Sequence, residues 1–304
     1  MPELTDVDVP SVWRRLGLPG LADIHVHFLP AGMLAKVWRY FDDAERHYGT
    51  AWPISYRTSD AERIATLAEL GVRRFPTLCY PHKPGMAAWL NQWCAEFAAE
   101  HPQAIHSGTF FGEPSAAADV RQALDRGARI FKVHLQVGGF DPSSAELDGA
   151  WGLLAEAGVP VVVHCGSGPL PGAFTGPGPI GVVLRRHPSL PLVIAHAGAP
   201  EYAEHLELAL RHPNVRLDTT MVGTGFLNRR APVPPDTLAR YRDAGDRIVL
   251  GSDFPNIPYP YAEQIQSLLG WGFGDDWLRQ VLWHNGARLL GLSDRSGEGA
   301  GRDD

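Results

Sequence analysis

Residues 130–164 have the sequence IFKVHLQVGGFDPSSAELDGAWGLLAEAGVPVVVH and contain one complete strand–helix–strand unit. Ile130–Leu135 and Val159–His164 are short runs rich in branched residues, which are typical of buried parallel strands. Between them, Leu147–Ala157 has apolar residues at helical spacing, and Gly158 is positioned to end that helix. The stretch therefore predicts two parallel strands joined by a helix.

The same alternation continues on both sides of this unit, from residue 21 to residue 269. The six other predicted strands are Leu21–His27, Val72–Cys79, Ile105–Phe111, Leu192–His196, Val215–Asp218 and Ile248–Gly251. The remaining predicted helices are a capped helix opened by Thr58–Glu62 and ended by Gly71, then Met86–Glu100, Ala116–Arg126, Ile180–Arg186, Glu201–Arg211, Pro235–Asp243 and Ala262–Leu269. Eight such units in about 250 residues predict a (β/α)8 TIM barrel. An open doubly wound sheet is the alternative, although no GxGxxG motif opens the first unit.

Two additions to the barrel are expected. The segment Phe28–Arg57, between the first strand and its helix, is rich in aromatic residues, which favours a packed lid or a subunit contact over a floppy loop. The aromatic side chains of this segment are equally consistent with packing in the core and with contact to a substrate. An extra amphipathic helix is predicted at Asp276–Leu292, so that residues 1–292 form one domain, and the tail 293–304 is expected to be disordered.

Composition limits the classes of function. Hydrophobic residues make up 44% of the 304 residues, and no apolar run approaches the about 18 residues that a membrane span needs. The first residues do not have the pattern of a secretory signal. A net charge of −7 argues against nucleic-acid binding, and three cysteines without a CxxC pair indicate reduced thiols. We therefore expect a cytoplasmic protein that acts on a small molecule, without a membrane or nucleic-acid partner.

Polar residues end four of the predicted strands. In DIHVH, His25 and His27 share one face because alternate side chains of a strand point the same way. His164, His196 and Asp253 each directly follow an apolar run. Any one of these residues alone is more typical of a buried, hydrogen-bonded group. Together, at the end of the barrel where such enzymes have their active sites, they predict a divalent metal ion of the zinc class.

The fourth strand adds Lys132 and His134 on one face. A lysine in an apolar strand is costly unless it is paired or neutral. Lys132 is therefore a candidate nucleophile, a candidate carbamylated bridge between two metals, or a cation that holds a carboxylate. A salt bridge at the rim of the barrel is the structural alternative.

Several further residues are expected at the mouth of the barrel, where each is more typical of a loop-stabilising role than of catalysis. They are Tyr80, His82, Lys83, Phe111, Glu113, Asp218 and Asn256. Cys165 follows His164 directly and should point into the barrel wall, which argues against a cysteine nucleophile.

Five motifs resemble the amidohydrolase superfamily, and most closely its amidohydrolase-related branch that includes aminocarboxymuconate-semialdehyde decarboxylase and the resorcylate decarboxylases. They are DIHVH at 23–27, VVVHCG at 161–166, IAHAG at 194–198, GSDFP at 251–255 and WHNGARLLGL at 283–292. The strand-four lysine adds to the resemblance, which covers residues 21–292. The branch usually has an Asn-Ala pair where this chain has Asn285-Gly286.

The resemblance implies a metal ion, usually zinc, held by His25, His27, His164 and Asp253. It implies that His196 activates the water or transfers protons. In superfamily members with two metals, a strand-four lysine is carbamylated, and the histidines of strands five and six bind the second ion. Lys132 occupies the position of this lysine, but the decarboxylase branch lacks the bridge. The resemblance therefore does not decide between one metal ion and two.

The leading prediction is a metal-dependent hydrolase that uses a metal-activated water on a small-molecule ester, lactone or amide. His196, Asp253 and Lys132 are the predicted catalytic residues, and His196 titrates in the useful range. The predicted substrate-binding residues are His134, Tyr80, His82 and Asn256. The alternatives are a metal-dependent decarboxylase of an aromatic or unsaturated carboxylic acid and an inactive metal-binding protein. The tryptophan-rich terminal segment, with Trp271, Trp277 and Trp283, is expected either to pack against the barrel or to join two chains in a homodimer.

Overall fold

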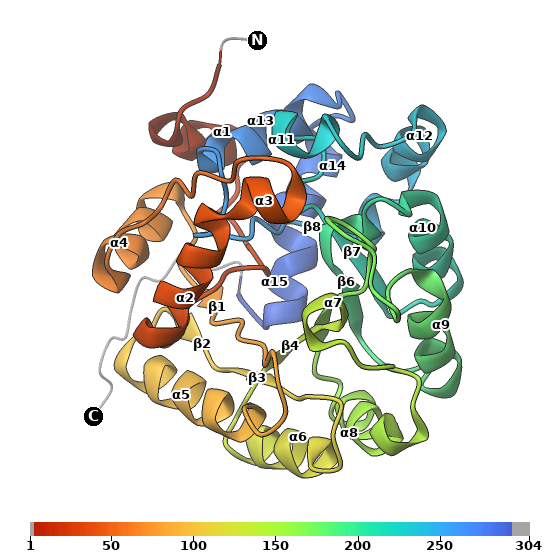
Figure 1. Cartoon of the computed structure of the whole chain (residues 1–304). Coiled ribbons are helices and arrows are strands. Elements are labelled where there is room, and N and C mark those ends of the chain that lie inside the picture. Colours follow the sequence, from red (N-terminus) through yellow and green to blue (C-terminus); the bar gives the residue numbers. More distant parts are fainter. Residues whose placement is uncertain (1–2, 294–304) are drawn as a thin grey trace, which may run out of the picture.

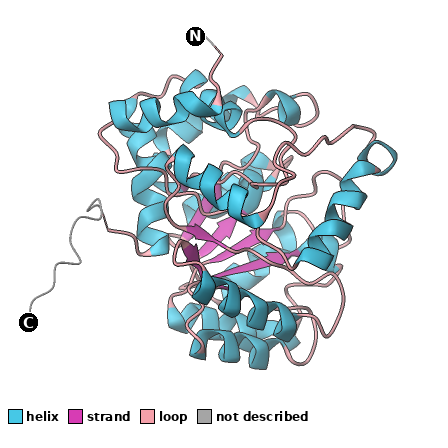
Figure 2. Ribbon diagram, turned by 90° about the vertical axis from the view of Figure 1, so that its left-hand side faces the viewer, coloured by secondary structure: helices cyan, strands magenta, loops and turns pink. Residues whose placement is uncertain are grey.

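Parallel strands form the centre of the computed structural model, which describes residues 3–293. Six of them pair in sequence order, and two more form a separate parallel pair. The six are β3 (Ser107–Thr109), β4 (Ile130–His134), β5 (Val161–His164), β6 (Leu192–Ile194), β7 (Val215–Asp218) and β8 (Ile248–Val249), and the pair is β1 (Phe75–Pro76) with β2 (Ala104–Ile105). Figure 2 shows the strands in the interior with helices around them.

The first predicted strand closes the ring of strands without being a regular strand itself. Main-chain hydrogen bonds join it to both neighbours, from Ile24 N to Leu250 O (3.0 Å) and from Leu78 N to Val26 O (3.0 Å). The regular ladder is interrupted because the His25 amide donates to the side chain of Asp23 (3.0 Å). The predicted (β/α)8 TIM barrel is thus confirmed, although Leu21–His27 contributes a single bridge, Val26 to Phe254.

The predicted third strand is divided into β2 and β3. The amide of Thr77 donates to the Ser107 side chain (2.9 Å) where a regular ladder would use a main-chain carbonyl. A side-chain acceptor therefore ends the β1–β2 pairing before β3 begins.

Eight helices follow the strands, and their ends agree closely with the predicted ones. They are α4 (Asp60–Leu70), α5 (Ala87–Glu100), α6 (Ala116–Asp125), α8 (Asp148–Ala157), α9 (Pro177–Arg186), α10 (Tyr202–Arg211), α12 (Pro235–Asp243) and α13 (Tyr261–Gly270). Ser59 and Glu62 form the predicted capping box of α4. α9 begins three residues before the prediction, because Pro177 suits the first turn of a helix.

The remaining described helices lie at the ends of the chain and in the loops. They are α1 (Val9–Arg15), α2 (Ala31–Asp42), α3 (Ala44–Tyr48), α7 (Leu135–Gly138), α11 (Gly225–Asn228), α14 (Asp275–Arg279) and α15 (Asn285–Leu290). α1 has no counterpart in the sequence analysis. A π-helical turn, Gln280–His284, lies within the predicted terminal helix. α2 and α3 are the insertion after the first strand (Figure 1), and apart from Ser293 the predicted disordered tail lies outside the described residues.

Within residues 3–293, no helix is both long enough and apolar enough to cross a lipid bilayer.

Gly71 ends α4 in a conformation that an L-residue rarely adopts. Its φ is 101°, and a Cβ there would lie 2.4 Å from Trp13 Nε1. We expect Gly71→Ala to lower the free energy of unfolding by about 2–4 kcal/mol, from backbone strain together with overpacking. Gly127→Ala is the matched control for denaturation measurements, since Gly127 has a φ of 90° but a Cβ there would have no other atom within 4 Å. Equal losses in both variants would contradict the packing argument.

Candidate metal centre

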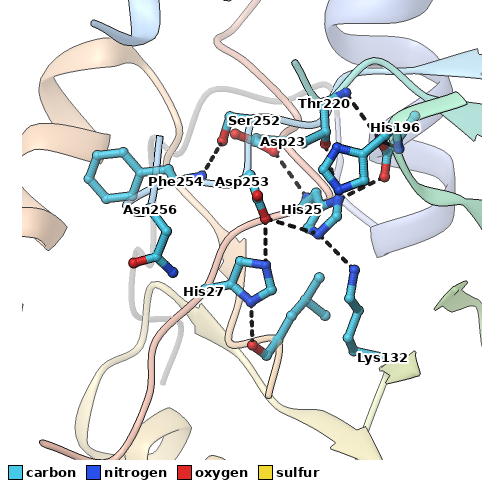
Figure 3. A network of polar contacts seen from close by, with 12 residues as sticks. Asp23, His25, His27, Lys132, His196, Thr220, Ser252, Asp253, Phe254 and Asn256 are labelled. Carbon is cyan, nitrogen blue, oxygen red and sulfur yellow. Dashed lines mark hydrogen bonds and ion pairs between the residues drawn. The ribbon is translucent and has the colours of Figure 1, made fainter. Parts of the chain in front are cut away.

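Side chains from distant parts of the sequence meet at the carboxyl ends of the strands. One potential ligand atom from each of His25, His196 and Asp253 lies within 4.8 Å of the other two. His27 joins them, because its Nε2 lies 2.8 Å from Asp253 Oδ1. Figure 3 shows these side chains pointing toward one another.

The hydrogen bonds on the outer sides of the two imidazoles fix which nitrogen faces inward. His27 Nδ1 lies 2.7 Å from the carbonyl oxygen of Leu78, which can only accept, so this nitrogen donates. His25 Nδ1 lies 2.8 Å from the carboxylate of Asp218. In the neutral imidazoles both Nε2 atoms therefore carry lone pairs, and both face Asp253 Oδ1, another acceptor. Such convergent acceptors fit a divalent cation, so the residues present suit a metal ion.

Charges in the cluster reinforce this arrangement. Burial lowers the pKa of His25 to about 4, with a further contribution from the charge of Lys132, so the ring is neutral at pH 7. Burial alone would raise the pKa values of Asp218 and Asp253, but the neighbouring histidines lower both below the ordinary value. Two ionised carboxylates beside the neutral imidazole of His25 attract a divalent cation.

Lys132 lies within this cluster on β4 and is 1% exposed. Its Nζ lies 2.8 Å from His25 Nε2. Burial lowers the pKa of Lys132 to about 8. No described carboxylate forms an ion pair with it, so the predicted alternative of a rim salt bridge is not formed.

The histidines of strands five and six approach the cluster differently. The His164 ring stacks on His134 with a centroid separation of 4.0 Å, and its Nε2 lies 2.9 Å from the carbonyl oxygen of Gly168. Nδ1 of His164 has no hydrogen-bond partner among the described residues, but His164 is not among the residues whose ligand atoms lie within 4.8 Å of one another. The His196 ring lies 4.8 Å from His164 and 5.5 Å from His25.

The backbone of His196 is unusual. His196 has a φ of 55°, in the left-handed region, and its amide donates to Asp218 Oδ1 (2.8 Å). Because a non-glycine residue in this region costs free energy, the Asp218 bond helps to hold the His196 ring against the cluster.

The other predicted residues divide into those near the cluster and those away from it. The Tyr80 ring lies 5.9 Å from His27 and 4.8 Å from His134. Asn256, three residues after Asp253, is almost buried. His82, by contrast, is exposed and has no hydrogen bond or ring contact with these histidines among the described residues.

Cys165 points away from the cluster, as expected from its place beside His164. Its sulfur lies 3.7 Å from His205 Nε2, and burial raises the pKa of the thiol to about 12. A thiol that stays protonated is a poor nucleophile.

Three residues that support the cluster were not predicted from the sequence to have this role. Asp218, treated as a loop residue, joins His25 to the amide of His196. Asp23 accepts hydrogen bonds from the His25 amide and from the Tyr261 hydroxyl. Its place two residues before His25 on the same face was a usable signal. Thr220, 3.0 Å from His25 Nδ1, had no such signal.

Asp218 gives a prediction about metal affinity. An amide at this position weakens the bond that orients His25, so we expect Asp218→Asn to reduce zinc affinity about 10–100-fold. Competition with a chelator measures this affinity. Asp119→Asn is the matched control, because Asp119 is also a largely buried aspartate but bonds to Ser115 on the outside of the barrel. Unchanged affinity in Asp218→Asn would contradict the supporting role.

The sequence profile of the amidohydrolase family matches residues 22–292. The chain therefore belongs to the amidohydrolase family, which confirms the resemblance seen in its motifs. Members of this superfamily are metal-dependent enzymes. Among curated proteins, the comparison finds no match.

Solved structures share the fold at low sequence identity. An uncharacterised TIM-barrel protein from Bordetella bronchiseptica is 21% identical over 88% of this chain and 97% of its own, with a TM-score of 0.72. The manganese-bound 5-carboxyvanillate decarboxylase from Novosphingobium aromaticivorans is 15% identical over 91% and 97%, with a TM-score of 0.64. A proposed 2-pyrone-4,6-dicarboxylic acid hydrolase from Pseudomonas putida is 18% identical over 90% and 98%, with a TM-score of 0.58.

Proposed function

We propose that this chain is a metal-dependent hydrolase that adds water across the ester, lactone or amide bond of a small molecule. The observation that carries the proposal is the position of Lys132. Its amine lies inside the ligand cluster, 2.8 Å from His25 Nε2, without a carboxylate partner among the described residues. The resemblance implies that in two-metal members of the superfamily a strand-four lysine is carbamylated and bridges the ions, and that the decarboxylase branch lacks this bridge.

The expected ligands are His25, His27, His164 and Asp253, and zinc is the expected ion. When bound, a divalent ion lowers the pKa of water toward about 7 and polarises the carbonyl group of a substrate. Lys132, after reaction of its amine with CO2, would supply a carboxylate for a second ion.

With one ion bound, His196 is the proposed proton carrier; with two ions, the resemblance implies that His196 is a ligand of the second ion. Its ring lies beside Asp253 within the cluster, and burial lowers its pKa, so the ring is a free base at neutral pH. A neutral imidazole here takes a proton from the attacking water and returns it to the leaving oxygen or nitrogen. Asp253, 18% exposed through its side chain, is the second group able to accept that proton.

A decarboxylase acting on an aromatic or unsaturated acid is the second candidate. The rings of Tyr80 and His134 beside the cluster, with centroids 4.8 Å apart and planes inclined by 44°, favour it because aromatic side chains pack well against an aromatic acid. The fold is shared with 5-carboxyvanillate decarboxylase, and a hydrolase is also among the similar structures.

One experiment separates the two reactions. The zinc-loaded protein is incubated with panels of lactones, esters, amides and aromatic acids in water enriched in oxygen-18. A hydrolase places one heavy oxygen in each new carboxylate, whereas a decarboxylase releases CO2 and places none in the product. CO2 release without oxygen-18 incorporation would reject the hydrolase, and no reaction with any panel would favour an inactive metal-binding protein.

A further inference from the structure

Two tryptophans of the insertion after the first strand hold Asn256 in place. Trp38 Nε1 donates to the side-chain oxygen of Asn256 (3.2 Å), and Trp52 Nε1 donates to its main-chain oxygen (2.7 Å). An indole N–H can only donate, so Trp38 fixes which end of the Asn256 amide faces it. The amide nitrogen must therefore point away from Trp38.

The amide nitrogen of Asn256 lies on the side of the candidate metal centre. Figure 3 shows this nitrogen on the side of His27 and the amide oxygen on the far side. Among the described residues, no acceptor bonds to it. It is also absent from the fully buried polar atoms that lack a partner, so it is accessible. Two N–H donors without a partner thus stand beside a cluster of acceptors.

Trp38 is itself held by two arginines. The guanidinium carbons of Arg57 and Arg63 lie 5.7 and 5.6 Å from its ring centroid. Arg57 also donates to the main-chain oxygen of Trp38 (2.9 Å). These contacts restrict the indole, so the orientation of the Asn256 amide is preorganised before any ligand binds.

The chemistry of an uncharged double donor defines what it can bind. It suits a carboxylate or carbonyl oxygen and offers nothing to an ammonium group. The nearby rings of Tyr80 and His134, with centroids 4.8 Å apart and planes inclined by 44°, add an aromatic surface against which a planar group can pack. The site therefore favours a small planar acid over a charged amine or a flexible chain.

We propose that Asn256 binds a carboxylate oxygen of a small planar substrate and that Trp38 is the positioning residue that orients it. The placement of this carboxylate next to the reacting carbon rests on the proposed function. The binding of the carboxylate itself does not, since it holds for a hydrolase and for a decarboxylase.

Titration calorimetry with benzoate tests this binding on the zinc-loaded protein. Asn256→Asp replaces the donors by a repelling carboxylate, and we expect about 30-fold weaker binding or more. Trp38→Phe keeps the ring but frees the amide to rotate, and we expect about 3- to 10-fold weaker binding. Trp52→Phe is the matched control, because it removes an indole bond to the same residue without releasing its side chain, and binding should change less than about 2-fold.

Further readouts separate positioning from a general structural effect. All variants should keep the thermal shift that zinc produces in the wild-type protein, and Asn256→Ser serves if Asn256→Asp does not fold. With any lactone acid that is turned over, Trp38→Phe should raise KM more than it lowers kcat. Failure of the wild type to bind benzoate, or equal binding by Asn256→Asp, would overturn the inference. If benzoate binds with the expected pattern but none of the esters, lactones or amides is hydrolysed, only the proposed function is rejected.

Discussion

Replacement of Asp253 by asparagine is expected to lower kcat/KM by at least about 10³-fold, close to 4 kcal/mol of transition-state stabilisation. The Oδ1 atom of Asp253 lies 2.8 Å from His27 Nε2 and 3.4 Å from His25 Nε2, so one carboxylate oxygen faces the lone pairs of both imidazoles. Asparagine removes the negative charge that a cation needs there. Its amide can also place N–H donors against the two lone pairs, which satisfies the imidazoles without a metal.

The Asp253→Asn variant should remain folded, so a loss of activity can be attributed to the loss of the metal ligand. Asp253 has a φ of 69°, and asparagine is among the residues that tolerate the left-handed region best. Zinc should therefore raise the Tm of the wild type but raise that of Asp253→Asn much less, because only a ligand that binds the native state stabilises it. Asp246→Asn, at an exposed aspartate that pairs with Arg247, is the control. Wild-type metal content together with wild-type turnover in Asp253→Asn would disprove the assignment.

The barrel was predictable because local sequence patterns identify most of its strands and helices. Three consecutive valines precede His164 in Val161–His164, and Leu192–Ile194 is wholly apolar, as parallel strands covered on both faces require. The first strand was harder to define, because the side chain of Asp23 takes the amide of His25 and the ladder is lost there. Competition between side chain and main chain for one N–H leaves no periodic signal in the sequence.

The candidate site was predictable only in part, because the orientation of its side chains depends on residues that are distant in the sequence. Strand ends indicated where His25, His27 and Asp253 would converge, since parallel strands all finish at one end of a barrel. The direction of each ring nitrogen depends on partners from other loops. The bond from His164 Nε2 to the carbonyl oxygen of Gly168 is one such case. The bond from Trp38 to Asn256 joins residues 218 positions apart, and no local pattern encodes it.

Lys132→Met is expected to lower turnover by at least about 10²-fold, and the reason follows from one lone pair. His25 Nε2 accepts a hydrogen bond from Lys132 Nζ at 2.8 Å. That nitrogen has a single lone pair, so a metal ion on His25 and the lysine hydrogen bond exclude one another. Once the ion binds, the amine must find another partner in a cluster where it is 1% exposed. Reaction with CO2 gives a carbamate and releases a proton, which converts a displaced donor into a ligand.

Metal stoichiometry distinguishes this outcome from a simple cation at position 132. If the amine becomes a carbamate, reconstitution with zinc should require bicarbonate, Lys132→Met should lose one of two ions, and acetate should partly restore Lys132→Ala. Lys132→Arg is the control, because it keeps a positive charge but cannot form the carbamate. Activity retained in Lys132→Arg, with one ion and no dependence on bicarbonate, would instead show that the side chain acts as a cation. That result would remove the main structural argument for a hydrolase over a decarboxylase, because the buried amine would then be better suited to holding the carboxylate of a substrate.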